Sequence, residues 1–266
     1  MEAKTNMPVL KQLHLFDSCI TLGRFVNDAW IGDAADLLAI MDRYQIEEAL
    51  VHEFHARSVY PLEHGNRRLM EIVRGQPRLH AEWVLEPPLQ PGAEPAEALV
   101  REMLGEGVKA ARLRLRAKGT LPWIWEDLLA ALEAHRVPGF LDFGSPETTL
   151  GELSDLEVDT VRSIALAHPG LPLVLSHVMG GLGVHPGVLY LVQRTPNVYL
   201  DITGILEYWR TAAAAVGPER VLFATGMPFT DPGILVANVQ YALGLEEPAK
   251  RSICGDNLRR LLGGVR

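Results

Sequence analysis

Residues 108–143 read VKAARLRLRAKGTLPWIWEDLLAALEAHRVPGFLDF, and this stretch sets the expectation for the whole fold. Val108–Leu115 alternates apolar and basic residues, which is typical of a strand. Trp123–Ala134 has the apolar spacing of an amphipathic helix, and Phe140–Leu141 begins another β-rich run. Because a helix between two strands returns the chain to the same edge of a sheet, we expect the two strands to be parallel.

The same alternation extends outward in both directions over the rest of the chain. The predicted strand and helix pairs are Leu13–Phe16 with Asp33–Arg43, Ala49–Val51 with Asn66–Val73, Leu79–Val84 with Glu94–Leu104, Val108–Leu115 with Trp123–Ala134, Phe140–Leu141 with Glu157–Ala167, Leu173–Leu175 with Gly187–Gln193, Val198–Ile202 with Ile205–Val216, and Val221–Phe223 with Ile234–Leu243. A last helix is expected over Pro248–Leu262.

This arrangement predicts an α/β fold, and within that class a (β/α)₈ TIM barrel. Such a barrel needs about eight strand–helix units in roughly 250 residues. We expect a single domain over residues 1–266, with the barrel core at about 13–263. An open doubly wound sheet is the alternative, but the residues after the first strand, DSCITLGR (17–24), lack its G-x-G-x-x-G turn.

Composition and charge exclude several other classes of protein. The 25 Lys and Arg residues against 33 Asp and Glu give a net charge of −8, which argues against nucleic acid as the main partner. Two cysteines, Cys19 and Cys254, cannot form a disulfide scaffold. The apolar runs are far shorter than the roughly 18 residues that span a membrane, and no signal-peptide pattern is present. We therefore expect a cytoplasmic protein without a membrane partner.

In a barrel of this kind, the side chains at the carboxyl ends of the strands form the active face. The candidates there, in strand order, are Asp17, Cys19 and Thr21; His52, Glu53 and His55; Trp83 and Glu86; Arg112, Arg114 and Arg116; Asp142; His177; Asp201 and Thr203; and Thr225, Gly226 and Asp231.

Six stretches resemble one known family in the same order along the chain. They are FDSCITLG (16–23), VPGFLDFG (137–144), LVLSHVMGG (173–181), NVYLDITG (197–204), RVLFATGMPF (220–229) and ICGDNLRRLLG (253–263). Together they resemble the amidohydrolase superfamily, in the branch of aminocarboxymuconate semialdehyde decarboxylase and metal-dependent barrel hydrolases. The resemblance implies the TIM barrel and a site at its mouth.

The resemblance also implies one divalent ion, held by two first-strand histidines, a fifth-strand histidine and an eighth-strand aspartate. At those four positions this chain has Cys19, Thr21, Asp142 and Gly226. We therefore expect no metal cofactor. The alternative is a zinc site rebuilt from Cys19, Asp142 and His177, which His52 and His55 could extend, because about three protein ligands suffice for a catalytic zinc ion.

His177 is the strongest catalytic candidate, because the family has a base or transition-state stabiliser at this position and imidazole exchanges protons near neutral pH. Asp201 could hold its tautomer. Cys19 is a candidate nucleophile, provided that a neighbour such as His177 or an arginine favours the thiolate.

Binding residues are also expected at the mouth. Arg112, Arg114 and Arg116 share one strand face, so they either pair with Asp142 in a salt-bridge network or clamp an anionic group of a substrate. Trp83 could line a pocket for a planar ligand, although packing in the core is the default use of a tryptophan.

Three hypotheses for the function stay open at this point. The first is an amidohydrolase-like hydrolase that acts on an ester, lactone or amide bond of a small anionic organic substrate without the usual metal. The second is a catalytically inactive relative that binds a metabolite or a protein partner. The third is a metal-dependent hydrolase or decarboxylase with the rebuilt Cys19, Asp142 and His177 site. Analogy with the family adds the expectation of a homodimer.

Overall fold

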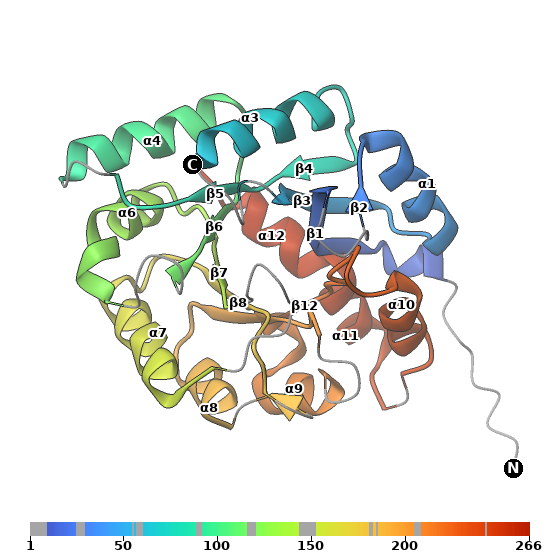
Figure 1. Ribbon diagram of the computed structural model, residues 1–266. Helices are drawn as coiled ribbons and strands as arrows, with labels where there is room; N and C mark the ends of the chain where they lie inside the picture. The colour runs from blue at the N-terminus through green and yellow to red at the C-terminus, as the bar shows by residue number, and fades with distance from the viewer. Residues whose placement is uncertain are drawn as a thin grey trace, which may run out of the picture.

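The computed structural model describes residues 10–24, 30–54, 56, 61–88, 92–115, 121–143, 153–180, 183–184, 186–204, 209–242 and 244–266. Its centre is a barrel of parallel strands surrounded by helices, as Figure 1 shows. The barrel strands, in order around the barrel, are β1 (Phe16–Arg24), β3 (Glu48–Glu53), β4 (Leu79–Ala81) continued by β5 (Trp83–Leu85), β6 (Ala111–Leu113), β7 (Gly139–Asp142), β8 (Leu173–Ser176), β11 (Val198–Asp201) and β12 (Val221–Leu222).

Two seams of backbone hydrogen bonds close the barrel. At one seam the chain passes from β4 to β5 at Glu82, whose N–H donates to the Val51 carbonyl at 2.8 Å. At the other seam β1 lies beside the residues after β12, where Ser18 N donates to Phe223 O at 2.9 Å and Gly226 N donates to Cys19 O at 3.1 Å. The prediction of a TIM barrel is confirmed.

Helices cover the outside of the barrel and close one of its ends (Figure 1). The outer helices are α1 (Ala34–Tyr44), α3 (Leu62–Val73), α4 (Ala93–Gly105), α6 (Pro122–Ala134), α7 (Asp155–Ala167), α8 (Pro186–Arg194), α9 (Trp209–Val216) and α10 (Pro232–Gln240). The C-terminal segment consists of α11 (Glu247–Arg251), the π-helical turn η3 (Ser252–Asp256) and α12 (Asn257–Gly263). Shorter elements are η1 (Leu10–Leu13), η2 (Pro218–Arg220), β2 (Trp30–Ile31), β9 (Met179–Gly180) and β10 (Gly183–Val184).

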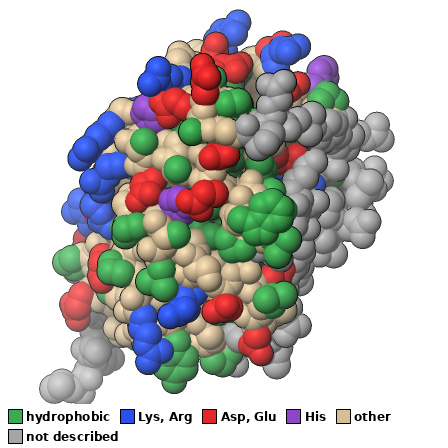
Figure 2. Space-filling view, turned by 90° about the vertical axis from the view of Figure 1, so that its left-hand side faces the viewer, with side chains coloured by type: hydrophobic (Ala, Val, Ile, Leu, Met, Phe, Trp, Pro, Cys, Tyr) green, Lys and Arg blue, Asp and Glu red, His purple; other side chains and the backbone are tan. Residues whose placement is uncertain are grey.

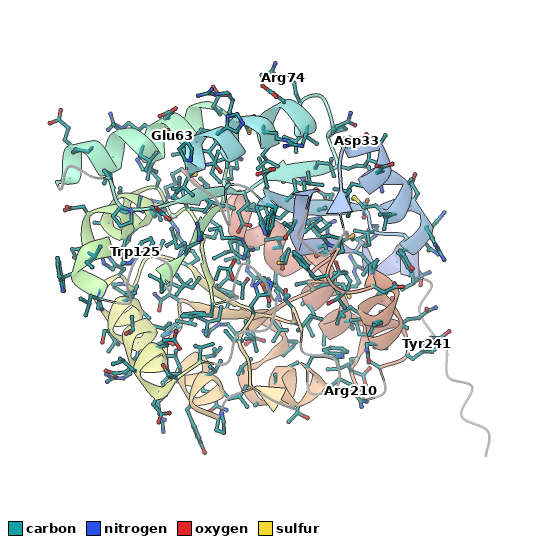
Figure 3. All side chains as sticks on the ribbon, viewed as in Figure 1. Asp33, Glu63, Arg74, Trp125, Arg210 and Tyr241 are labelled. Atoms are coloured by element: carbon teal, nitrogen blue, oxygen red, sulfur yellow. The ribbon has the colours of Figure 1, made fainter. Side chains whose placement is uncertain are left out.

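The inner layers of the barrel change from apolar to charged along the strands. The layer at the amino ends packs against α12. The buried residues of the layer are Phe16, Leu50, Ala110, Phe140, Val174 and Leu222, and those of α12 are Leu258, Leu261 and Leu262. Side chains on a strand face one side at every second residue. Two residues after Ala110 and Phe140, the same faces therefore carry Arg112 and Asp142, and both are buried. Figure 3 shows how densely side chains fill this interior.

Several predicted boundaries are wrong. The first strand begins at Phe16 rather than Leu13 and continues to Arg24, so Cys19 and Thr21 lie within it. The third strand is broken at Glu82, and the Asn66 side chain of α3 takes over as the partner of the β5 backbone: its Nδ2 donates to Val84 O at 2.9 Å, and Val84 N donates to its Oδ1 at 3.0 Å. The predicted last helix is interrupted by η3.

One face of the molecule mixes several types of side chain. Figure 2 shows the side of the molecule at the left of Figure 1, where hydrophobic side chains lie among acidic and basic ones. In the part of the chain that the structure describes, no helix has both the length and the apolar character needed to cross a membrane.

Candidate active site

A buried arginine lies at the centre of the candidate site. Arg112 extends from the middle of β6, and each of its three guanidinium nitrogens faces a different acidic group. Its Nε donates to Glu82 Oε2 at 2.7 Å, its Nη1 lies 3.3 Å from Asp142 Oδ2, and its Nη2 donates to Cys19 Sγ at 3.7 Å. The three partners come from the β4–β5 junction, β7 and β1, so the guanidinium ties four strand positions together. The predicted pairing of Arg112 with Asp142 is confirmed.

A histidine extends this network on each side. His52, from β3, places Nδ1 3.1 Å from Glu82 Oε2, and its Nε2 is hydrogen-bonded to the Thr21 hydroxyl at 2.9 Å. His177 places Nδ1 3.2 Å from Asp142 Oδ1. The two carboxylates thus each bridge Arg112 to one imidazole.

His177 owes its position to an unusual backbone conformation. It directly follows β8, and its φ of 58° lies in the left-handed region, which residues other than glycine seldom adopt. The preceding residue, Ser176, is paired in register with Asp142, so a continued strand would turn the next side chain to the opposite face. The left-handed turn instead brings the His177 ring inward, where Nε2 lies 4.0 Å from Cys19 Sγ. Such strain commonly occurs at functional positions.

Burial controls the protonation of the groups around Arg112. It raises the pKa of Glu82 to about 7, against the opposing effect of the Arg112 charge. It also raises the pKa of the Cys19 thiol to about 12, although the same guanidinium acts in the other direction. Burial by itself would lower the pKa of Arg112, but Glu82 and the other acids raise it, so this side chain is a permanent cation. Cys19 is therefore a thiol near neutral pH.

Two more buried carboxylates hold the backbone near the site: Asp17 is the second residue of β1, and Asp201 is the last residue of β11. Asp17 accepts hydrogen bonds from Cys19 N at 3.0 Å and from both the backbone N and the hydroxyl of Thr225, at 3.0 and 2.5 Å. Asp201 accepts from Thr203 N at 3.0 Å and from the Ser176 hydroxyl. Burial raises the pKa of both carboxyl groups, that of Asp17 to about 7.

The carboxylate beside His177 Nδ1 is Asp142, whereas the sequence pointed to Asp201 for that role. Asp201 lies near enough for the His177 charge to lower its pKa against the larger effect of burial. Asp142 thus lies within ion-pair distance of the imidazole, and the hydrogen bonds of Asp201 hold the turn that follows β11.

The remaining predicted residues have different positions. Arg114, which follows β6, retains 14% side-chain exposure and lies 3.7 Å from Glu86. Trp83 pairs in register with Ala111, on the face opposite to Arg112, and lines a groove of about 490 Å³ between α3 and α4. Figure 3 labels Glu63 and Arg74, which also line this groove, on α3 and just after it. Arg116 and His55 lie outside the described residues.

Sequence reasoning missed Glu82, although it lies within the strand-like run LHAEWV (79–84). An acidic residue inside an apolar strand is itself a signal, because burying a carboxylate without a cation or hydrogen bonds is costly. Arg112 is the nearest such cation.

The donor set does not fit the divalent ion that the family resemblance implies. Gly226 offers no ligand, and a Cβ there would lie 2.9 Å from Thr203 Cγ2 on a backbone with φ of 71°. The Thr21 hydroxyl is engaged with His52, and Asp142 is engaged with Arg112. Among the described residues, no three His, Cys, Asp or Glu side chains are grouped to hold a metal ion, and this includes the predicted set of Cys19, Asp142 and His177.

Comparison with known proteins identifies the family. Residues 34–264 match the family described as amidohydrolase. The chain belongs to the amidohydrolase family. No curated protein sequence matches it.

Several solved structures share the fold of this amidohydrolase. A 5-carboxyvanillate decarboxylase from Sphingomonas paucimobilis aligns with a TM-score of 0.71 at 14% identity, over 96% of this chain and 100% of that one. A candidate 2-pyrone-4,6-dicarboxylic acid hydrolase from Pseudomonas putida aligns with a TM-score of 0.70 at 19% identity, over 95% and 98%. A dihydroxybenzoic acid decarboxylase from a Polaromonas species, solved with bound manganese, aligns with a TM-score of 0.66 at 15% identity, over 94% and 96%. At these identities the likeness establishes the fold.

Proposed function

We propose that this amidohydrolase hydrolyses an ester, lactone or amide bond in a small anionic molecule, with His177 as the group that moves the proton. The observation that carries the proposal is the pairing of His177 with Asp142 at the carboxyl end of β8. Active sites of TIM barrels lie at this end. An imidazole oriented by a carboxylate is the usual arrangement for general acid–base catalysis.

Water is the better nucleophile in this proposal. The Cys19 thiol is buried and its pKa is raised to about 12, so very little thiolate is present near neutral pH. The 4.0 Å between Cys19 Sγ and His177 Nε2 is also long for a hydrogen bond that would activate a nucleophile. His177 would take a proton from water as the carbonyl is attacked, and would return it to the leaving oxygen or nitrogen.

Arg114 is the residue proposed to bind the anionic group of the substrate. Arg112 cannot serve, because all three of its nitrogens are engaged with buried partners. Arg114 lies two residues further toward the carboxyl end of the barrel, is partly exposed, and has its Nη1 3.7 Å from Glu86 Oε1. A substrate carboxylate could replace the contact with Glu86 by a bidentate pair of hydrogen bonds to the Arg114 guanidinium.

The first test is a panel of small carboxylated esters, lactones and amides, followed by His177→Asn on any substrate that is hydrolysed. Loss of a general acid–base group should lower kcat by about 100-fold or more. The matched control is His80→Asn, because His80 also pairs with a carboxylate (Glu48, at 2.7 Å) but lies in the middle of β4, which forms the amino-terminal half of the third barrel strand. Full activity of a folded His177→Asn variant would refute the role of His177. A wild-type chain that hydrolyses nothing in the panel would refute the proposed reaction in favour of a binding role.

The second test concerns the anion. Arg114→Gln should raise KM for the carboxylated substrate while leaving kcat and the KM of its uncharged amide analogue nearly unchanged, because a binding contact made equally in the ground and transition states acts on KM alone. An equal effect on both substrates would refute the assignment of Arg114.

A further inference from the structure

The side chains around Arg112 have the chemistry of metal ligands. Two carboxylates and one thiol, those of Glu82, Asp142 and Cys19, contact the guanidinium, and each carboxylate also lies beside one imidazole, that of His52 or His177. Nitrogen, oxygen and sulfur donors of these types are those that bind zinc and related ions. A set of this kind in one buried shell calls for a positive charge at its centre.

We infer that the guanidinium of Arg112 is the permanent cation of this site and keeps a divalent ion out. With it in place these side chains, like the other described His, Cys, Asp and Glu residues, are not grouped to hold a metal ion, and they can gather around one only after the guanidinium is removed. Each acidic group already has a guanidinium nitrogen as its partner, at 2.7 Å for Glu82, 3.3 Å for Asp142 and 3.7 Å for Cys19. Metal–ligand bonds are only about 2.0–2.3 Å long, so a metal ion would have to displace these partners and would then lie beside a second cation.

Burial makes this exclusion strong. The side chains of Arg112 and Glu82 are fully buried, and that of Asp142 is 1% exposed, so water screens little of the repulsion between the guanidinium and an incoming ion. Arginine also keeps its proton at any pH used for a folded protein, so the guanidinium does not make room for a metal ion by becoming neutral. Gly226 is consistent with this arrangement, because the tight contact with Thr203 leaves no space for a fourth ligand from that strand.

The inference does not rest on the proposed function, because its test measures metal content and thermal stability without any substrate. The wild-type chain and the Arg112→Ala and Arg112→Lys variants are treated with chelator, incubated with ZnCl₂ or MnCl₂, passed through gel filtration and analysed for metal. The wild-type chain should retain far less than one ion per chain and show no rise in Tm. Arg112→Ala should lose on the order of 10 °C in Tm, because the buried carboxylates lose their guanidinium partner. It should regain much of this loss on binding about one zinc ion.

Arg112→Lys keeps a cation in place and is the matched control, so it should retain no metal. Co²⁺ in Arg112→Ala should show thiolate-to-metal absorption that disappears in the Arg112→Ala, Cys19→Ser double variant, which locates the ion at this site. A folded Arg112→Ala variant without zinc would overturn the inference. A wild-type chain that keeps one ion per chain, and loses it in Asp142→Asn, would overturn it as well, and this result is decisive even where Arg112→Ala does not fold.

Discussion

Asp17 allows a test of how the barrel closes beside the candidate site. Its carboxylate accepts three hydrogen bonds: one comes from Cys19 N within β1, and two come from the backbone N and the hydroxyl of Thr225 and join β1 to the residues after β12. Burial raises the pKa of Asp17 from the usual 3.8 to about 7, against the opposing effect of these hydrogen bonds. The folded chain therefore binds this proton more tightly than the unfolded chain does.

The sign of the pH dependence follows from that difference. The contribution of Asp17 to the free energy of unfolding is fully present below about pH 4 and is lost as the pH rises to about 7. The interval from 3.8 to about 7 corresponds to a loss of roughly 4 kcal/mol, at 1.36 kcal/mol per pKa unit. Asp17→Asn keeps the shape and cannot ionise, since its amide oxygen can accept both backbone N–H groups and its NH₂ group can donate to the Thr225 hydroxyl.

The measurement is urea unfolding of both chains from about pH 4 to about pH 8, and the quantity of interest is the difference in unfolding free energy, Asp17→Asn minus wild type. This difference should rise by about 4 kcal/mol over the range. Asp33→Asn is the matched control, because Asp33 caps α1 from an exposed position and asparagine caps helices equally well. A flat difference for Asp17→Asn would refute the reasoning, because the three donors would then outweigh burial and keep the carboxyl ionised throughout.

Three further predictions concern single positions. Asn66→Ala should lower the free energy of unfolding by about 2–4 kcal/mol in urea titrations, because it removes the hydrogen bonds to two backbone groups of β5. The control Asn238→Ala removes one exposed hydrogen bond, to Ile234 O, and should lose less than about 1 kcal/mol. Equal losses in the two variants would contradict this prediction. Gly226→Ala should lower the free energy of unfolding by at least about 1 kcal/mol more than Gly244→Ala does. Both glycines have a positive φ, but of the two only Gly226 has a side chain, that of Thr203, within 3 Å of the position of an added Cβ. Equal Tm values for the two variants would show that this contact does not matter. In the folded chain Cys19 should resist iodoacetamide at about pH 8, because burial raises its pKa to about 12, and rapid labelling seen by peptide mass spectrometry would instead favour the role of nucleophile.

The fold was predictable from the sequence because periodicity is a local property. Each strand-like run needs only its own neighbours to be recognised, and the order of the runs then implies a barrel. The boundaries were less predictable where a tertiary contact decides them. The third strand is broken at Glu82, and beyond the break the Asn66 side chain, 18 residues away in sequence from Val84, is hydrogen-bonded to the β5 backbone in place of β3.

The candidate site was predictable in its members but not in its pairing. Strand alternation placed the three arginines on one strand face and the order of the strands placed Asp142 beside them, and the contact of Arg112 with Asp142 is one of the two alternatives that this left open. The left-handed turn at His177 brings Asp142, rather than Asp201, beside His177 Nδ1. The residue pattern LVLSHVMGG does not predict this turn. Backbone conformations of this kind are imposed by the surrounding structure and cannot be deduced from local propensity.

The electrostatics of the barrel explain why Glu82 and Arg112 occur together. A carboxylate in this interior without a cation would be protonated, as the rise in the pKa of Glu82 to about 7 indicates even in the presence of Arg112. A guanidinium without its acids would be equally unfavourable, because breaking a buried ion pair costs about 3–5 kcal/mol. Each side chain is therefore tolerated only because of the other, and a substitution at either position should be rescued in part by a neutral side chain of similar size at its partner. Glu82→Gln combined with Arg112→Met should accordingly be more stable than either single variant in urea unfolding, whereas simple additivity of the two losses would show that the two side chains are held independently.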